Sequence, residues 1–275
     1  MSFFSDLSKK LGNAQSADAT KHSASSKKGV HQEKLTAHFK DLKLPDDARS
    51  FGSPVCIMLF TNRSGSNVLG EYLRATHQFS GFVEALNYRR VIKYSQKNEL
   101  YSFFDYLRWQ VSRLSEGEKV IGIKASIDQA EMLFQCNAIP GYFNKVHWLM
   151  VQRDDTLAQA ISFSIAAQTR QWTSNDTPTS ADPVYNFEDI KRRIEMLCDE
   201  QAQLNAFCAM RGISPIRATY EEFTADSKGS VLSIAGQMGI EGLSLDESLL
   251  TLRPQSDGRN EEFRARFIED YAARN

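Results

Sequence analysis

The feature that most constrains the fold of this chain is an unbroken apolar run, Val55–Phe60, that ends in a short polar loop. Six residues are far too few to cross a bilayer, which takes roughly 20, but they suit a strand buried on both faces of a parallel sheet. The loop 61–67 is rich in Ser, Asn and Gly, and after it Val68, Leu69 and Leu73 recur with helical spacing. We therefore expect a strand, a tight loop and a helix in direct succession.

The rest of the chain repeats this alternation of apolar strands and amphipathic helices. We expect further strands at 120–124, 146–151 and 213–220, and helices at 156–172, 186–211, 228–238 and 261–274. Strands that alternate with helices are typical of an α/β fold with a parallel sheet. The sequence therefore predicts a P-loop-like three-layer fold, in which a central, mainly parallel sheet is flanked by helices.

The first fifty residues differ from the remainder in composition. Residues 12–29 are dominated by Ser, Ala, Lys and Thr and show no apolar periodicity, which is typical of a flexible linker. We expect a flexible N-terminal segment at 1–50 and one domain at 51–275. A short apolar stripe at the start either docks as a helix on the domain, a partner or a membrane surface, or simply frays; it consists of Phe3, Phe4, Leu7 and Leu11.

Charge and cysteine content exclude several classes of protein. The net charge of −1 argues against a nucleic-acid-binding surface, so no nucleic-acid partner is expected. The N-terminus shows no secretory leader, and we expect a cytoplasmic protein whose four cysteines stay reduced. No CxxC pair or His/Cys cluster occurs, so no metal site is expected.

The loop after the first strand has the composition of an anion-binding cradle. Backbone N–H groups gather at the start of a helix that follows a strand. Here Gly65 would let the backbone approach an anion, Ser64 and Ser66 would add hydroxyl groups, and Arg63 would add a fixed charge. The nucleotide-hydrolase signature GxxxxGK[ST] needs a Gly-Lys pair. The chain contains none, which argues against that class.

Four segments, in order, resemble bacterial sulfotransferases related to trehalose 2-sulfotransferase. The first is the loop Arg63–Ser66 with Leu69 and the helix after it. The second runs from His147 through Arg153 to Phe163. The third is Arg217–Phe223, and the fourth is Gln255–Phe263 near the end of the chain. Together they cover nearly everything after the expected linker.

This resemblance implies a reaction and a set of donor-binding residues. The donor would be 3′-phosphoadenosine 5′-phosphosulfate (PAPS), the acceptor a hydroxyl group, and the assembly a homodimer. Arg63 and the loop through Asn67 would hold the phosphosulfate, and Arg153 with Ser162 would hold the 3′-phosphate. Gln255 and Arg259 would lie in a C-terminal loop that also binds the donor.

A hydroxyl acceptor must also lose its proton, so a general base is needed. Glu84 is the strongest candidate because the resembling family carries a glutamate a few residues after a glycine, here Gly81. Lys124 resembles a family lysine that either binds the donor or pairs with Glu84. His147 and the pair Asp154 and Asp155 are the remaining candidates for the base. Around Glu84 the sequence lacks the proline and aromatic residues of the family, so the acceptor stays open: a carbohydrate, a glycolipid or another small alcohol.

Two other functions are compatible with the sequence. An ATP- or GTP-dependent phosphotransferase would use the strand that ends before Asp154 to hold a metal ion. A non-catalytic relative would bind a nucleotide or a partner without turnover, since Asn67 stands where the family usually has threonine. Transfer of label from radioactive PAPS separates both from a sulfotransferase.

Overall fold

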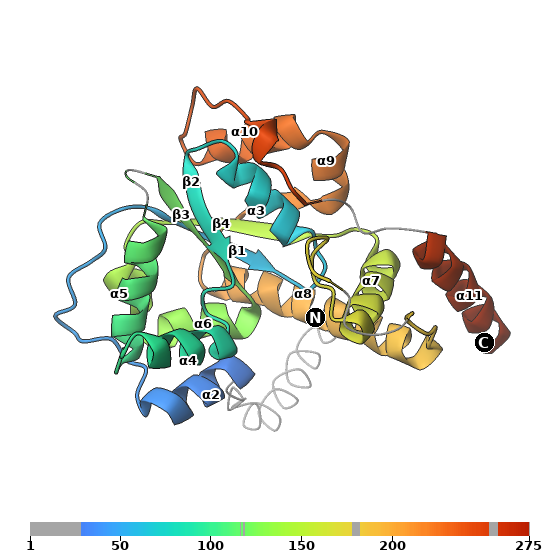
Figure 1. Ribbon diagram of the computed structural model, residues 1–275, viewed down its shortest axis with the longest axis horizontal. Coiled ribbons are helices and arrows are strands. Elements are labelled where there is room, and N and C mark those ends of the chain that lie inside the picture. The colour runs from blue at the N-terminus through green and yellow to red at the C-terminus, as the bar shows by residue number, and fades with distance from the viewer. Residues whose placement is uncertain (1–28, 116, 118, 178–181, 253–257, 275) are drawn as a thin grey trace, which may run out of the picture.

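The computed structural model describes residues 29–115, 117, 119–177, 182–252 and 258–274, and its core is one parallel sheet (Figure 1). The described strands form a five-stranded sheet in the order β2-β3-β1-β4-β5. All four pairings are parallel. The strands are β1 (Val55–Phe60), β2 (Phe79–Val83), β3 (Val120–Ala125), β4 (Val146–Gln152) and β5 (Ile216–Thr219).

Helices cover both faces of this sheet (Figure 1). One face carries α3 (Ser66–Arg74), α9 (Tyr220–Ala225) and α10 (Ser227–Gln237), and the other carries α4 (Tyr88–Lys97), α5 (Phe103–Leu114), α6 (Ile127–Gln135) and α8 (Phe187–Met210). Successive residues of β1 alternate between the two cores: Ile57 and Leu59 belong to one, Cys56 and Met58 to the other. The expected α/β fold with three layers and a parallel sheet is therefore confirmed.

Two helices extend the molecule beside the sheet. The first, α7 (Thr156–Thr169), follows β4, and the last, α11 (Gly258–Arg274), lies against α7 and α8. A separate apolar cluster joins them, in which the rings of Phe187 and Phe267 stack with centroids 4.9 Å apart. Two short helical turns complete the fold, at Ala138–Tyr142 and Glu247–Leu249.

The expected flexible segment at 1–50 needs a correction in its second half. Residues Val30–Phe39 form α2, whose Leu35 is fully buried, and Leu42 and Leu44 are buried in the same core. The start of α2 lies so close to α6 that a Cβ at Gly29 would fall 2.2 Å from Cβ of Asp128. Compositional bias ends at residue 29, so we now propose that the domain begins there and not at residue 51.

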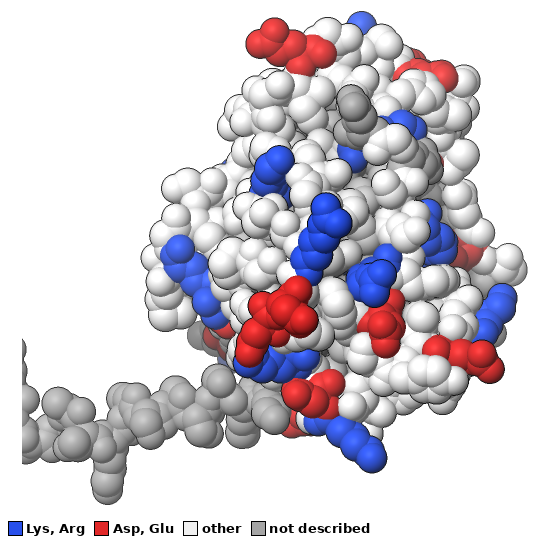
Figure 2. Space-filling model, turned by 90° about the vertical axis from the view of Figure 1, so that its left-hand side faces the viewer, with Lys and Arg blue, Asp and Glu red and all other residues white. Residues whose placement is uncertain are grey.

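The N-terminal apolar stripe Phe3, Phe4, Leu7 and Leu11 and nearly all of the expected linker lie outside the described residues. Within the part that is described, no helix is both long enough and apolar enough to cross a membrane. Figure 2 views the molecule from the side of α4 and α5, where acidic and basic side chains alternate over the surface. That face therefore carries no continuous field of one sign.

Most of the expected elements are present with modest differences at their ends. The helix expected at 156–172 ends at Thr169, because Arg170 takes the left-handed conformation (φ 59°) that stops a helix. The strand expected at 213–220 is shorter, since Tyr220 already begins α9. The edge strand β2 and the helices α4, α5 and α6 were not expected. In β2, Gly81 and Phe82 have positive φ (80° and 52°), so the apolar alternation that marks a strand is broken there.

Candidate active site

A large cavity opens at the carboxyl ends of the strands, where ligands bind in parallel α/β sheets. Its volume is about 1720 Å³, compared with roughly 300–1,000 Å³ for a typical pocket for one small molecule. The residues that directly follow four of the strands line it: Glu84 after β2, Ser126 after β3, Arg153 after β4 and Tyr220 after β5. The cavity is therefore large enough for two substrates.

The loop between β1 and α3 forms one wall of this cavity. Arg63 and Gly65 both adopt left-handed backbone conformations, with φ of 62° and 87°. A Cβ at Gly65 would lie 2.5 Å from the ring of Tyr220, so only glycine fits beside that ring. Because Gly65 is the N-cap of α3, no side chain caps the first turn of the helix. The N–H groups of that first turn are left without partners inside the helix.

Contacts from α7 fix the conformation of this loop. The side-chain amide of Gln159, which is buried, donates to Oγ1 of Thr61 at 2.9 Å and to the carbonyl of Asn62 at 2.7 Å. Ser64 is fully buried, and its hydroxyl has no hydrogen-bond partner among the described residues. The loop is therefore held in shape by the body of the protein, before any ligand is present.

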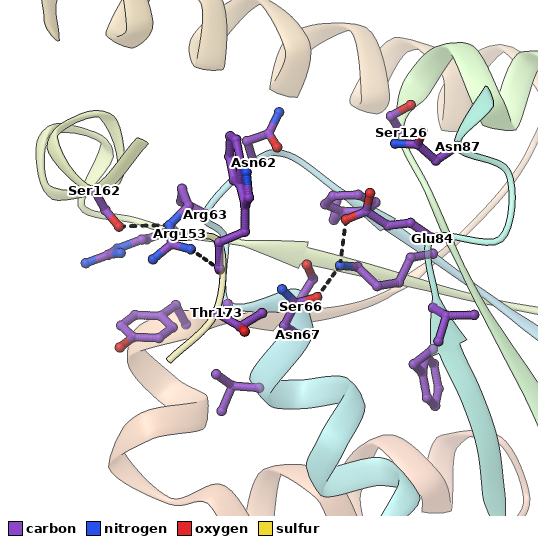
Figure 3. Close-up of a pocket in the computed structure, with 18 of the residues that line it drawn as sticks. Asn62, Arg63, Ser66, Asn67, Glu84, Asn87, Ser126, Arg153, Ser162 and Thr173 are labelled. Atoms are coloured by element: carbon purple, nitrogen blue, oxygen red, sulfur yellow. Dashed lines mark hydrogen bonds and ion pairs between the residues drawn. The ribbon is translucent and has the colours of Figure 1, made fainter. Parts of the chain in front are cut away.

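Two arginines converge next to the loop (Figure 3). Arg63 donates from Nε to the hydroxyl of Ser162 at 2.9 Å, and its guanidinium also donates to the carbonyl of Trp172. The guanidinium of Arg153 lies over the ring of Tyr220, 4.5 Å from its centroid. Nε of Arg153 is buried and makes no hydrogen bond to the described residues, since Oε1 of Glu221 is 3.8 Å away.

Electrostatics make this end of the cavity attractive to anions. Burial lowers the pKa of the Arg63 guanidinium, and the nearby charge of Arg153 lowers it further. Two partly buried guanidinium groups that repel each other are stabilised by an anion placed between them. The arrangement thus suits a phosphate or sulfate group.

The second polar group of the cavity is centred on Lys124 in β3. Its ammonium donates to Oδ1 of Asn67 at 2.5 Å and lies 3.4 Å from Oε1 of Glu84 (Figure 3). The Lys124 side chain is only 2% exposed, whereas that of Glu84 is 44% exposed. Burial lowers the pKa of Lys124, while the carboxylate of Glu84 opposes that effect. Lys124 therefore connects the anion-binding loop with the candidate base.

The structure places the remaining predicted site residues in different ways. Arg259 donates to Asp182 at 3.0 Å and does not belong to the described lining of the cavity, whereas Arg264 of the same helix does. Gln255 lies outside the described residues. His147 is near the start of β4, at the opposite end of the strand from the cavity. Asp155 caps α7 and accepts two hydrogen bonds from Arg264, which leaves Glu84 as the strongest candidate base.

Comparison with known proteins identifies the family of the chain. The family model of the Stf0 sulphotransferases matches residues 130–270, just over half of the chain. The chain belongs to the Stf0 sulphotransferase family. Among solved structures, it is similar to the sulfotransferase domain of the olefin synthase of Synechococcus PCC 7002, with a TM-score of 0.47 and 13% identity over 80% of this chain and 83% of that one. No curated protein matches the chain.

The family match covers only part of the site of this Stf0 sulphotransferase. Arg153 and Ser162 lie within the matched residues, but the loop around Arg63, Glu84 and Lys124 precede them. The fold brings both parts together, since Arg63 is hydrogen-bonded to Ser162 across 99 residues of sequence. The chain is a sulfotransferase, and its cavity is lined by residues of the part that the family model matches and of the part that precedes it.

Several lining residues of the sulphotransferase were not predicted from the sequence. Trp172 and Thr173 form a turn held by Asp176, whose carboxylate accepts from both backbone N–H groups. Glu71 of α3 accepts three hydrogen bonds from Thr251 and Leu252, which ties the segment before α11 to the helix that follows the anion-binding loop. Asp176 lies in a short polar stretch that predicts a turn. Glu71 looks like an ordinary surface glutamate in the sequence, so nothing there indicates its contact.

Proposed function

We propose that the protein transfers the sulfuryl group of PAPS to a hydroxyl group of a carbohydrate, a glycolipid or another small alcohol. The observation that carries this proposal is the pair Arg63 and Arg153 beside an uncapped helix start; Nε of Arg153 makes no hydrogen bond to the described residues and only a 3.8 Å ion pair with Glu221. PAPS carries phosphate groups at both the 3′ and the 5′ position, so it needs two anion sites in one cavity. Family membership supplies the reaction class.

In this proposal the two arginines divide the donor between them. Arg63 and the N–H groups of residues 64–67 hold the phosphosulfate, and Arg153 with Ser162 holds the 3′-phosphate. In the described structure Ser162 accepts from Arg63, so donor binding would reorganise this hydrogen bond. Charge develops on the 5′-phosphate as it leaves, and the fixed donors of the loop would stabilise it.

Glu84 is the proposed general base for the acceptor hydroxyl. The ammonium of Lys124 lies beside it, 3.4 Å from Oε1, and holds the carboxylate in place. Because Lys124 also contacts Asn67, it would keep the base at a fixed place relative to the donor loop. The reaction needs in-line placement of hydroxyl, sulfur and leaving oxygen. The donor loop follows β1 and Glu84 follows β2, and both strands pair with β3, which carries Lys124 between them.

The proposal also covers the route of acceptor entry, the oligomeric state and the location of the protein. The acceptor would enter from the side of Glu84, Asn87 and Ser126, which lie together away from the two arginines (Figure 3). The resemblance to the family also leads us to propose a homodimer in the cytoplasm. Light scattering of the purified protein tests the homodimer, and a monomer would contradict it.

The experiment that tests the function measures donor recognition and transfer separately. We expect 3′-phosphoadenosine 5′-phosphate (PAP) to raise the melting temperature more than AMP does, because AMP lacks the 3′-phosphate that Arg153 and Ser162 would bind. Label from [35S]PAPS should then appear in hydroxyl compounds of a lysate extract. Equal stabilisation by PAP and AMP would contradict the donor assignment, and tight PAP binding without any transfer would indicate a non-catalytic relative.

A further inference from the structure

The imidazole of His31 lies in the same cavity as Glu84, although the residue falls in the N-terminal segment 1–50 that the sequence predicts to be flexible. It is the second residue of α2, which packs on α4 and α6. The backbone N–H of His31 donates to Oδ2 of Asp128 at 3.1 Å, and Ser126 donates to the other oxygen of that carboxylate at 2.6 Å. The helix start is thereby attached to the loop that follows β3.

The position of the proton on this imidazole follows from its neighbours. The backbone N–H of Tyr88 donates to Nδ1 of His31 at 3.0 Å. A ring nitrogen that accepts a hydrogen bond carries no proton, so the neutral ring must carry its proton on Nε2. The ring also contacts the Tyr88 ring edge-on, with centroids 5.6 Å apart, which restricts its rotation.

The Nε2–H group has no acceptor among the described residues. The side-chain nitrogen of Gln129 lies 3.3 Å from Nε2. That amide is oriented by a capping box, in which its oxygen accepts from the backbone N–H of Ser126 at 3.0 Å. The nitrogen of Gln129 is therefore a donor as well, and two donors do not bond to each other. Nε2–H remains free for a ligand in the cavity.

Burial favours the neutral form of the His31 ring. Burial lowers the pKa of His31, and the carboxylates of Asp128 and Glu84 oppose this shift. Glu84 and His31 both line the cavity. A neutral imidazole with one fixed donor suits an uncharged oxygen atom better than an anion.

We propose that Nε2–H of His31 donates a hydrogen bond to an oxygen atom of the acceptor and so orients the reacting hydroxyl toward Glu84. This inference rests on the proposed sulfotransferase function, and it defines the acceptor further: the molecule carries a second, uncharged oxygen atom near the hydroxyl that is sulfated. A hydroxyl, ether or glycosidic oxygen meets that description. His31 is then a positioning residue for the acceptor, contributed by the N-terminal helix.

Two substitutions separate this role from a purely structural one. In His31→Asn, Oδ1 takes the place of Nδ1 and still accepts from Tyr88, but the donor at Nε2 is lost. In His31→Gln, the side-chain nitrogen reaches the position of Nε2, but the acceptor for Tyr88 is lost. The matched control is His38→Asn, on the same helix and outside the described lining of the cavity.

The assay uses [35S]PAPS with a panel of trehalose, methyl α-glucoside, N-acetylglucosamine and glycerol, and takes the best substrate forward. We expect His31→Asn to lower kcat/KM for that acceptor roughly 3- to 10-fold, as for one neutral hydrogen bond, with the KM for PAPS and the melting temperature unchanged. His31→Gln should retain most of the acceptor kcat/KM and lower the melting temperature. Unchanged acceptor kinetics in His31→Asn would overturn the proposal.

A second measurement needs no acceptor. Long-range 1H–15N spectra of the histidine-labelled protein, assigned with His31→Asn, report which ring nitrogen carries the proton. We expect the Nε2–H tautomer at pH 7.5, and the Nδ1–H tautomer or a charged ring would overturn the proposal. If no panel member is sulfated, the assay counts against the proposed function, and the tautomer alone decides the assignment of His31.

Discussion

The two ends of the cavity are built in different ways. The end around Arg63 and Arg153 comes from loops that directly follow neighbouring strands, β1 and β4. The end around Glu84 also needs α2, α4 and α6, whose residues are up to 103 positions apart where they touch. The donor end is therefore formed mainly by strand-end loops that carry recognisable motifs, with Ser162 of α7 bonded to Arg63. The acceptor end depends in addition on the packing of α2 against α4 and α6. Changes in the packing should affect acceptor binding before they affect donor binding.

The largest expected effect tests the packing at the acceptor end. Deletion of residues 1–45 removes the buried side chains of Leu35, Leu42 and Leu44. At about 1.5–3 kcal/mol for each buried leucine, the deletion should cost about 5–9 kcal/mol, which is comparable with the whole stability of a domain. We expect insoluble or unfolded protein, checked by circular dichroism and thermal melting. Deletion of residues 1–28 is the matched control. A stable 46–275 fragment that still binds PAP would mean that the domain begins near residue 51, as expected from the sequence.

A single substitution then tests the chemistry at the same end. Glu84→Gln keeps the size of the side chain and still accepts from Lys124, but removes the basic oxygen. We expect the turnover number to fall by on the order of 10²–10⁴-fold, with PAP affinity unchanged by calorimetry. Near-native turnover in this variant would mean that Glu84 is an ordinary polar residue and not the base. Loss of PAP binding as well would mean that Glu84 mainly orients Lys124.

The donor end is tested by Arg153→Ala, for which the expected effect is smaller. Loss of one charge-assisted hydrogen-bonding group should weaken PAP binding roughly 10- to 100-fold and leave AMP binding nearly unchanged. Titration calorimetry of both nucleotides measures this preference. Arg259→Ala is the matched control, because Arg259 pairs with Asp182 in the described structure. A greater loss from Arg259→Ala than from Arg153→Ala would reverse the two assignments.

The same contrast explains how much the sequence could predict. The run Val55–Phe60 and the polar loop after it determine a buried strand and its turn, because apolar periodicity and turn residues act locally. The edge strand β2 escaped prediction, since positive φ at Gly81 and Phe82 interrupts its pattern. The sequence also places His31 in the flexible N-terminal segment. Leu35, Leu42 and Leu44 are too few to predict that this segment is buried, and the apolar residues that they pack against come from distant parts of the chain.

The exposure of Glu84 has a consequence for the end of each catalytic cycle. With 44% of its side chain accessible, the carboxylate meets bulk water directly, while Lys124 behind it is almost fully enclosed. If Glu84 takes the proton of the acceptor, it can return that proton to solvent without a relay of side chains. The enclosed ammonium of Lys124, in contrast, has almost no direct contact with bulk water. Resetting the base is therefore a direct exchange of one proton with the solvent.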